Sequence, residues 1–378
     1  MTLLYCFITS LVIVFFTMPI FIRLMLKYHI LDSSVGRKKH NGNKVNMGGI
    51  IIFLACIVSC LLAMHSYKPS CNIDYIITFL IVLCCIAIVG VRDDMNTLSA
   101  KTKLIIEIIF ILFICNIGLR IDNLFGFFGI HKLPIVISYA ATIFFIVVVL
   151  NAYNLIDGID GQAATQALNV IVPLFLFFML CIPKNYICQD CFGSPILWRI
   201  LLVSVGGGLI GFLFFNWEPS KVFMGDTGSI TIGTIIACSM IVAMQYNGYL
   251  GSEAKICGLV AIKSKIGVVC VLFFIPFADT LRVFCDRIKR GFSPFHPDRS
   301  HIHHLFLRTG ATHAKTSLLT LTFSVTISII GMILSTLVDD NIFIPLIVVM
   351  FFLYVITLHY VIKFRIKKMR AKQLCQKK

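Results

Sequence analysis

Eleven apolar runs of roughly 17 to 25 residues constrain the fold of this 378-residue chain more than any other feature. Each run is long enough to cross about 30 Å of hydrocarbon as an α-helix. They lie at about residues 3–26, 48–64, 75–91, 104–119, 134–150, 163–182, 196–215, 227–245, 259–279, 316–338 and 342–362. We therefore predict an all-α polytopic integral membrane protein with about eleven transmembrane helices.

The composition agrees with a chain that has the bilayer as its main solvent. Of its residues 58% are hydrophobic and 13% are charged, and the mean hydropathy is +0.94, values that a water-soluble domain of this size does not reach. The first run has no basic n-region and no A-x-A-like cleavage site, so we expect it to remain as a permanent span. Because no internal repeat or linker divides the chain, we predict one transmembrane catalytic domain over residues 1–365 and a basic cytoplasmic tail over 366–378.

The lysines and arginines of the loops predict the orientation. If the N-terminus is outside, the inner loops and the C-terminal tail carry 24 of the 33 basic residues and the outer loops carry 8. The C-terminus is then cytoplasmic. This bias, together with attraction to anionic head groups, explains the net charge of +16, so we expect membrane lipids and no nucleic acid as partners.

Polar residues gather in four loops, and the predicted topology places all four on the cytoplasmic side. The residues are Asp93, Asp94, Asn151, Asn154, Asp157, Asp160, Asp226, Asp298, His301, His303 and His304. A transporter would carry ionisable residues in mid-span or paired broken helices around a midplane site, whereas these spans are nearly free of charge. We therefore expect an enzyme that works at the membrane surface, with a transporter as the alternative.

The adjacent carboxylates of Asp93 and Asp94 lie between two of the apolar runs. They repel each other and so favour a nearby cation, which Mg²⁺, Lys101 or Lys103 would supply. A solvated charged cap between two helices is the alternative interpretation of this pair.

Two further segments place carboxylates among glycines. Residues 151–161, Asn-Ala-Tyr-Asn-Leu-Ile-Asp-Gly-Ile-Asp-Gly, combine amides that can bind a nucleotide or sugar with glycines that allow close backbone approach. An Asx-rich turn cluster is the alternative for that segment. In residues 223–229, Phe-Met-Gly-Asp-Thr-Gly-Ser, Asp226 is a candidate Mg²⁺ ligand beside a helix start whose N–H groups would face a diphosphate.

The longest inner loop ends in a histidine run, His301-Ile-His303-His304, which follows several basic residues. Histidine and arginine side chains are suitable donors to phosphate oxygens. A zinc site is the alternative, but the run has no HExxH motif, and its neighbours are hard-oxygen and cationic groups suited to phosphate and magnesium.

Taken in order, these motifs resemble those of the polyprenyl-phosphate N-acetylhexosamine-1-phosphate transferases of glycosyltransferase family 4. The resemblance covers about residues 37 to 310 and rests on several separate segments. These are Arg37-Lys-Lys-His40, Met47-Gly-Gly49, Asp93-Asp94 with Ser99 and Lys103, residues 151–161, residues 223–229 and the run from His301 to His304.

The resemblance implies transfer of a sugar 1-phosphate from a UDP-sugar to undecaprenyl phosphate, giving a lipid diphosphate sugar and UMP. The form Pro297-Asp-Arg-Ser-His-Ile-His-His304 is more similar to the GlcNAc-1-phosphate branch, which starts cell-envelope polysaccharides such as lipopolysaccharide O-antigen. We therefore expect UDP-GlcNAc as donor, with UDP-GalNAc and UDP-MurNAc-pentapeptide as alternatives. A transporter of lipid-linked sugars is the alternative from another functional class. The same resemblance suggests the bacterial inner membrane as location, an active site on its cytoplasmic face, and a homodimer.

The resemblance also suggests a role for each motif residue. Asp226 would bind Mg²⁺, with Mn²⁺ as the alternative cation, while Asp93 or Asp94 would act as base or nucleophile. The expected catalytic residues are Asp93, Asp94, Lys103, Asp157 and His301. The expected substrate-binding residues are His40, Asn151, Asn154, Asp160, Phe223, Arg299, His303 and His304.

Overall fold

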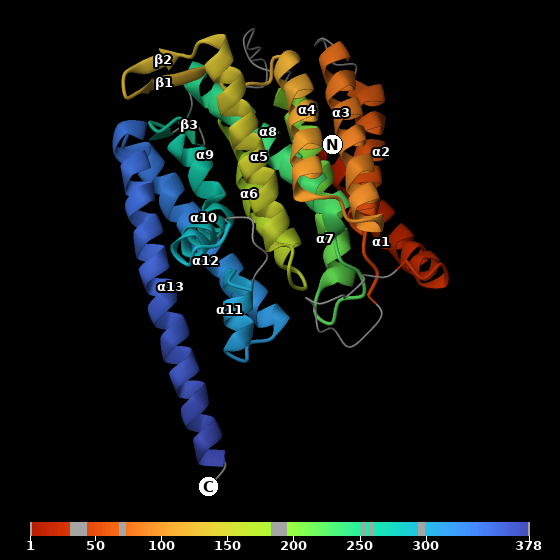
Figure 1. The fold of residues 1–378 in the computed structure, drawn as a ribbon. Coiled ribbons are helices and arrows are strands. Elements are labelled where there is room, and N and C mark those ends of the chain that lie inside the picture. The colour runs from red at the N-terminus through yellow and green to blue at the C-terminus, as the bar shows by residue number, and fades with distance from the viewer. Residues whose placement is uncertain are drawn as a thin grey trace.

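A computed structural model describes residues 2–30, 44–67, 73–182, 195–250, 255–256, 260–293 and 299–376. Within these ranges the chain is built almost entirely of helices (Figure 1). They are α1 (Thr2–Lys27), α2 (Gly49–Tyr67), α3 (Ile73–Met95), α4 (Ala100–Asn116), α5 (Ile135–Ile156), α6 (Gln162–Leu180), α7 (Pro195–Asn216), α8 (Gly225–Leu250), α9 (Gly267–Leu272), α10 (Phe274–Lys289), α11 (Ile302–Arg308), α12 (His313–Leu337) and α13 (Asp340–Gln376).

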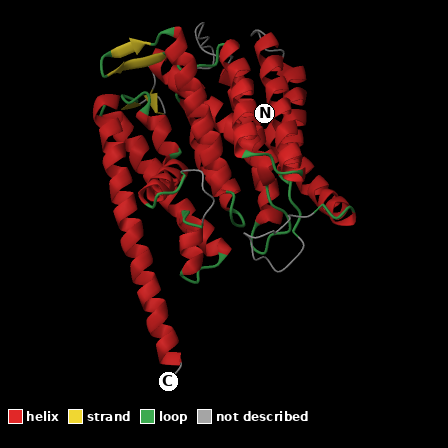
Figure 2. Cartoon of the chain, in the orientation of Figure 1, coloured by secondary structure: helices red, strands yellow, loops and turns green. Residues whose placement is uncertain are grey.

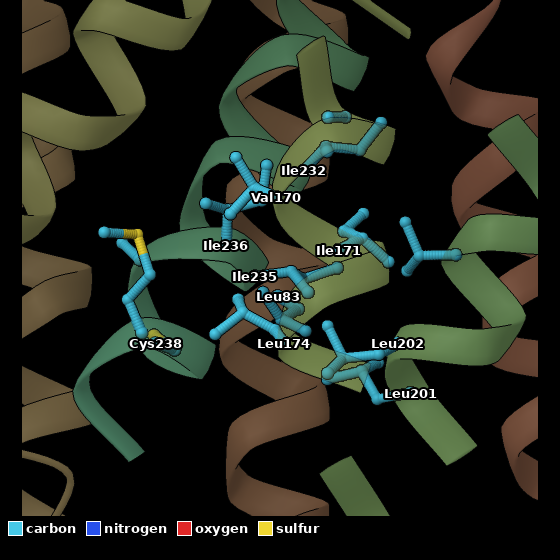
Figure 3. Packing of buried hydrophobic residues seen from close by; sticks show 14 of the residues in the cluster. Leu83, Val170, Ile171, Leu174, Leu201, Leu202, Ile232, Ile235, Ile236 and Cys238 are labelled. Atoms are coloured by element: carbon cyan, nitrogen blue, oxygen red, sulfur yellow. The ribbon is translucent and has the colours of Figure 1, made fainter. Parts of the chain in front are cut away.

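Helix α8 forms the centre of the bundle. Its residues from Thr227 to Asn247 are all buried, and α2, α3, α5 and α6 pack directly against it. Figure 3 shows apolar side chains of α3, α6, α7 and α8 meeting in the core around Leu83, Leu174 and Ile235. The start of α8 is therefore fixed in position by several neighbouring helices.

The lengths and apolar composition of the helices agree with the prediction of a membrane protein. Among the described residues, seven helices are long and apolar enough to cross a membrane, namely α1, α5, α6, α7, α8, α12 and α13. The apolar part of α2, Gly49–His65, is shorter. The chain is thus a nearly all-α protein with several candidate spans, and the count of eleven stays a prediction.

The predicted continuous span 259–279 is divided in the structure. Helix α9 ends at Leu272 and α10 begins at Phe274, running at an angle to α9 (Figure 1). Pro276 explains the break, because it has no N–H to donate to the carbonyl of Leu272 and its ring would clash with that group. Asn169 of α6 donates to this carbonyl at 3.2 Å and satisfies it inside the protein.

Small strands depart from the all-α expectation. Strands β1 (Asn123–Phe127) and β2 (Ile130–Lys132) form one antiparallel hairpin, and β3 (Lys255–Ile256) pairs with β4 (Val260–Ala261) (Figure 2). The periodicity of apolar runs carries no information on such short pairs in loops. At the other end of the chain, α13 continues through residue 366 to Gln376, so the predicted tail extends the last helix.

Glycines allow α2 and α3 to approach the start of α8 closely. A Cβ on Gly49 would lie 2.1 Å from the Cα of Gly228, and one on Gly90 would lie 2.5 Å from the Cα of Thr227. Any larger side chain at either position would push the helices apart. This packing brings the acidic end of α3 directly to the first turn of α8.

Candidate active site

The predicted functional segments meet at one end of the bundle. The α3–α4, α5–α6 and α7–α8 connections and helix α11 all lie at the lower end in Figure 1, opposite the β1–β2 hairpin. Side-chain contacts between these segments confirm that they are neighbours, as described below. The convergence predicted from the span count is therefore present in the structure.

Lys103 bridges two of the predicted carboxylates. Its Nζ lies 2.8 Å from Asp93 Oδ2 and 2.9 Å from Asp226 Oδ1, linking the end of α3 to the start of α8. Asn154 of α5 donates its amide to the same Asp226 oxygen at 2.5 Å. Lys103 of α4 and Asn154 of α5 thus meet on the Asp226 carboxylate of α8, and Lys103 joins Asp93 of α3 to this cluster.

The charges of this cluster support one another. Burial by itself would lower the pKa of the Lys103 ammonium, but the carboxylates of Asp226 and Asp93 outweigh it and raise that pKa. The Asp226 side chain is 31% exposed, compared with 6% for Asp93 and 16% for Lys103. Asp226 is therefore the member most open to a ligand.

Asp94 caps the start of α8. Its two carboxylate oxygens accept hydrogen bonds from the backbone N–H groups of Asp226 and Thr227, from the Thr227 hydroxyl at 2.6 Å and from Asn46 Nδ2. Burial raises the pKa of this carboxyl to about 6, although the bonds from Thr227 lower it. A Cβ on Gly225, whose φ is +75°, would lie 2.8 Å from the same carboxylate, so this turn requires glycine.

Asn151 faces a buried acid of α4. Its Nδ2 donates to Glu107 Oε2 at 3.0 Å and to the Val147 carbonyl at 2.9 Å. The other oxygen of Glu107 is buried and has no hydrogen-bond partner in the part of the chain that the structure describes. Asn151 thus lies one helical turn before Asn154 on α5, and its amide is already bound by groups of the protein. Asp157 is the C-cap residue of the same helix.

Asp160 lies in a separate, buried network. It contacts Lys44 Nζ at 3.1 Å, His313 Nδ1 at 3.3 Å and the backbone N–H of Ser220 at 3.2 Å. Burial alone would raise the pKa of this carboxyl, but His313, Ser220 and Lys44 together hold it well below its usual range. The carboxylate joins the α5–α6 turn to the α7–α8 connection and to the start of α12.

Phe223 lies beside this network and is 4% exposed. The ammonium of Lys44 lies over its ring, 4.8 Å from the centroid, and its backbone N–H donates to the Val45 carbonyl at 2.8 Å. The ring therefore already has a cation on one side.

His301 is oriented by a carboxylate that the sequence analysis does not single out. Asp279 of α10 has no exposed side-chain surface, and its Oδ2 lies 3.0 Å from His301 Nδ1. Arg282 binds the same carboxylate at 2.6 Å, and the backbone N–H of Ile302 also donates to it. His301 Nε2 is buried and has no hydrogen-bond partner among the described residues.

The histidine run reaches the α5–α6 turn through His303. A Cβ on Gly158 would lie 2.3 Å from His303 Nε2, so the glycine lets the ring lie directly on the backbone. The rings of His301 and His303 are stacked, with centroids 5.9 Å apart, and His304 packs against His303 at 4.2 Å. The Arg299 carbonyl accepts a bond from Arg308, which holds the segment before the run.

Two predicted residues cannot be placed. His40, with the rest of the Arg37–His40 motif, and Asp298 lie outside the described residues. Of the residues that the sequence did not single out, Asp279 stands in a predicted apolar span. Arg282 follows it by three residues, and residues three apart share a helix face, so this spacing could have indicated a buried ion pair.

The donor set suits a hard cation that is shared with a substrate. In the described part of the chain, no three His, Cys, Asp or Glu side chains are grouped closely enough to hold a metal on their own. Magnesium commonly binds through one or two carboxylates plus substrate phosphates. The carboxylates of Asp93 and Asp226, already close to the cation of Lys103, fit that pattern.

A family model and individual relatives among known proteins point to the same family. A model of glycosyl transferase family 4 matches residues 76–244. The chain is 29% identical over 308 residues to a probable undecaprenyl-phosphate N-acetylglucosaminyl 1-phosphate transferase of Bacillus subtilis, which covers 81% of this chain and 78% of the relative.

Two further relatives carry names that differ in the sugar phosphate that is transferred. A phospho-N-acetylmuramoyl-pentapeptide-transferase of Streptococcus pyogenes is 30% identical over 253 residues, which are 61% of this chain and 69% of the relative. An undecaprenyl-phosphate alpha-N-acetylglucosaminyl 1-phosphate transferase of Yersinia pestis is 26% identical over 364 residues, which are 93% of this chain and 89% of the relative.

Proposed function

This chain belongs to glycosyl transferase family 4, and we propose that it transfers GlcNAc 1-phosphate from UDP-GlcNAc to undecaprenyl phosphate, releasing UMP. The Bacillus subtilis and Yersinia pestis relatives, which cover most of the chain, are named for GlcNAc 1-phosphate transfer and support this donor over UDP-MurNAc-pentapeptide. The product would start a cell-envelope polysaccharide.

The position of Lys103 between Asp93 and Asp226 is the observation that carries the proposal. Transfer between two phosphates is opposed by the negative charge of both partners. A site for this reaction needs fixed cations together with acidic groups that recruit a metal. This cluster offers both at the end of the bundle where the other motifs also meet.

Mg²⁺ would be held by Asp226, with Asp93 beside it, and would neutralise the diphosphate of the donor. Asn154 fixes the orientation of Asp226 through its 2.5 Å hydrogen bond, and Lys103 keeps the two carboxylates from repelling each other. These contacts would hold the carboxylates in place before the donor arrives.

The two aspartates of the Asp93-Asp94 pair have different roles in this proposal. Asp94 uses both oxygens to fix the first turn of α8, so we assign it the task of positioning Asp226. Asp93 accepts from the Leu98 N–H and binds Lys103, and through Lys103 it belongs to the Asp226 cluster, so we assign it to the acceptor phosphate, as a base or as a nucleophile. A phosphate monoester loses its second proton near pH ~6, so base catalysis would contribute little at neutral pH.

The histidine run would bind the phosphates of the donor. The buried Nε2 of His301 would act as an acceptor when neutral or a donor when protonated, with its Nδ1 fixed by Asp279. His303 lies against the α5–α6 turn that carries Asp157, and His304 packs on the ring of His303. The site would face the cytoplasm of a bacterial inner membrane, where UDP-sugars are made.

The test is UMP release by purified protein in detergent with Mg²⁺, undecaprenyl phosphate and one donor at a time. The donors are UDP-GlcNAc, UDP-GalNAc and UDP-MurNAc-pentapeptide, and Asp226→Asn is the inactive control. Turnover with UDP-GlcNAc alone is the expected result. Turnover with another donor would keep the reaction and overturn the specificity, and no turnover by folded wild-type protein with any donor would favour a transporter.

A further inference from the structure

A groove of about 1020 Å³ lies between α10, α11 and α13, apart from the carboxylate cluster. One wall is apolar and is formed on α13 by Phe351, Phe352, Val355 and Leu358. Figure 1 shows α13 on the opposite side of the bundle from α3 and α4, which carry Asp93 and Lys103. The groove therefore lies away from the carboxylate cluster around Lys103.

The groove changes from apolar to basic along α13. Lys363 and Lys367 follow the apolar residues on the same side of the helix, and Lys289 and Arg282 of α10 line the groove as well. Asp286 is the acidic residue of the lining, and Arg290 already binds it at 2.7 Å. A ligand of the groove thus meets an apolar surface at one end and an excess of positive charge at the other.

We propose that this groove binds an anionic phospholipid of the bilayer, with the acyl chain on the apolar wall and the phosphate among the basic residues. Lysine ammonium groups at the end of a membrane helix attract anionic head groups. A zwitterionic lipid would leave this charge uncompensated. A lipid in this position would lie beside α10 and α11, which carry Asp279 and the histidine run.

Arg282 connects the groove to the pair formed by Asp279 and His301. It lines the groove and also binds Asp279 at 2.6 Å and the Ser300 carbonyl at 2.6 Å. Its side chain is 13% exposed, so it is held mainly by these two partners. The lysines, in contrast, are exposed and are free to follow a bound phosphate.

Native mass spectrometry of the full-length protein in detergent measures this binding. Phosphatidylglycerol and phosphatidylcholine with identical acyl chains are titrated against wild type, and we expect phosphatidylglycerol to bind about tenfold more tightly. Lys363→Gln/Lys367→Gln should lose this preference, while Lys363→Arg/Lys367→Arg should keep it. Equal binding of both lipids to wild type would overturn the proposal.

A charge-matched control removes two other exposed lysines, in Lys221→Gln/Lys315→Gln, and should bind phosphatidylglycerol like wild type. A loss in the control equal to that in the groove variant would show a general effect of net charge and refute the site. Displacement of phosphatidylglycerol by equimolar undecaprenyl phosphate would instead identify the groove with the acceptor. The measurement needs no turnover, so its outcome is independent of the proposed transferase activity.

Discussion

The carboxylate of Asp279 and the imidazole of His301 form a buried pair, with 3.0 Å between Oδ2 and Nδ1. Because the carboxylate accepts from Nδ1, the proton of the neutral ring is placed on that nitrogen, and Nε2 is left as the reactive position. The same carboxylate also binds the backbone N–H of Ile302, so it fixes both the ring and the start of α11.

Asp279→Asn should lower kcat by roughly tenfold to a hundredfold while changing KM less, because the ring loses its fixed tautomer. His301→Gln should cost at least as much, and the double variant should be no worse than His301→Gln alone. Additive losses in the double variant would mean that Asp279 acts independently of His301.

Lys103→Gln should lower kcat by about 10²–10³-fold, because it leaves the carboxylates of Asp93 and Asp226 without their shared cation. Lys101→Gln is the matched control, since Lys101 is exposed on the same helix, and it should retain activity within about twofold. UMP release measures both variants. If Lys101→Gln fell as far as Lys103→Gln, the assignment of the bridging cation would be wrong.

Gly158→Ala should reduce activity strongly with little loss of stability. The new Cβ would lie 2.3 Å from His303 Nε2, so the His303 ring would have to move. Gly206→Ala is the control, since a Cβ there meets its nearest atom, on Ile171, at 3.9 Å. That change should preserve activity and raise the melting temperature slightly, because alanine favours a helix by about 1 kcal/mol over glycine. Full activity of Gly158→Ala would show that His303 does not need to lie on this turn.

The lowered pKa of the Asp160 carboxyl predicts that the stability of the protein depends on pH. The folded pKa of this carboxyl is lowered, so its stabilising effect is complete above the unfolded value of about 4 and is lost as the pH falls through the folded pKa. Asp160→Asn should therefore destabilise the protein by about 2 kcal/mol at pH 7, and the difference from wild type should shrink below pH ~4. Melting temperatures across this range measure it, and a difference that is constant with pH would contradict the ion-pair explanation.

The sequence predicted that the acidic and histidine motifs would meet, because counting apolar runs places their loops on one side. The contacts between Lys103 and Asp226 and between Gly158 and His303 agree with that expectation. The separate role of Asp94 could not be predicted in the same way. It depends on how closely α3 approaches α8, which local sequence does not determine.

Hydropathy also misplaced one boundary. Residues 259–279 look like a continuous apolar run, but α9 begins at Gly267 because Asp340, far along the chain, accepts from the backbone N–H groups of Lys265, Ile266 and Gly267. Long-range capping of this kind leaves no periodic pattern. Asp279 was overlooked because it stands at the end of that apolar run, where only its spacing from Arg282 distinguishes it.

The break between α9 and α10 also sets the rotational phase of the second helix. Each residue of an α-helix turns its side chain by about 100° relative to the one before. The chain from Phe273 to Asp279 therefore determines which way this carboxylate points, independently of the helix before it. Inserting one alanine after Pro276 would turn Asp279 away from His301 without replacing any residue of the site. The first turn of α10, which contains Pro276, thus sets the direction from which Asp279 meets His301 and the start of α11.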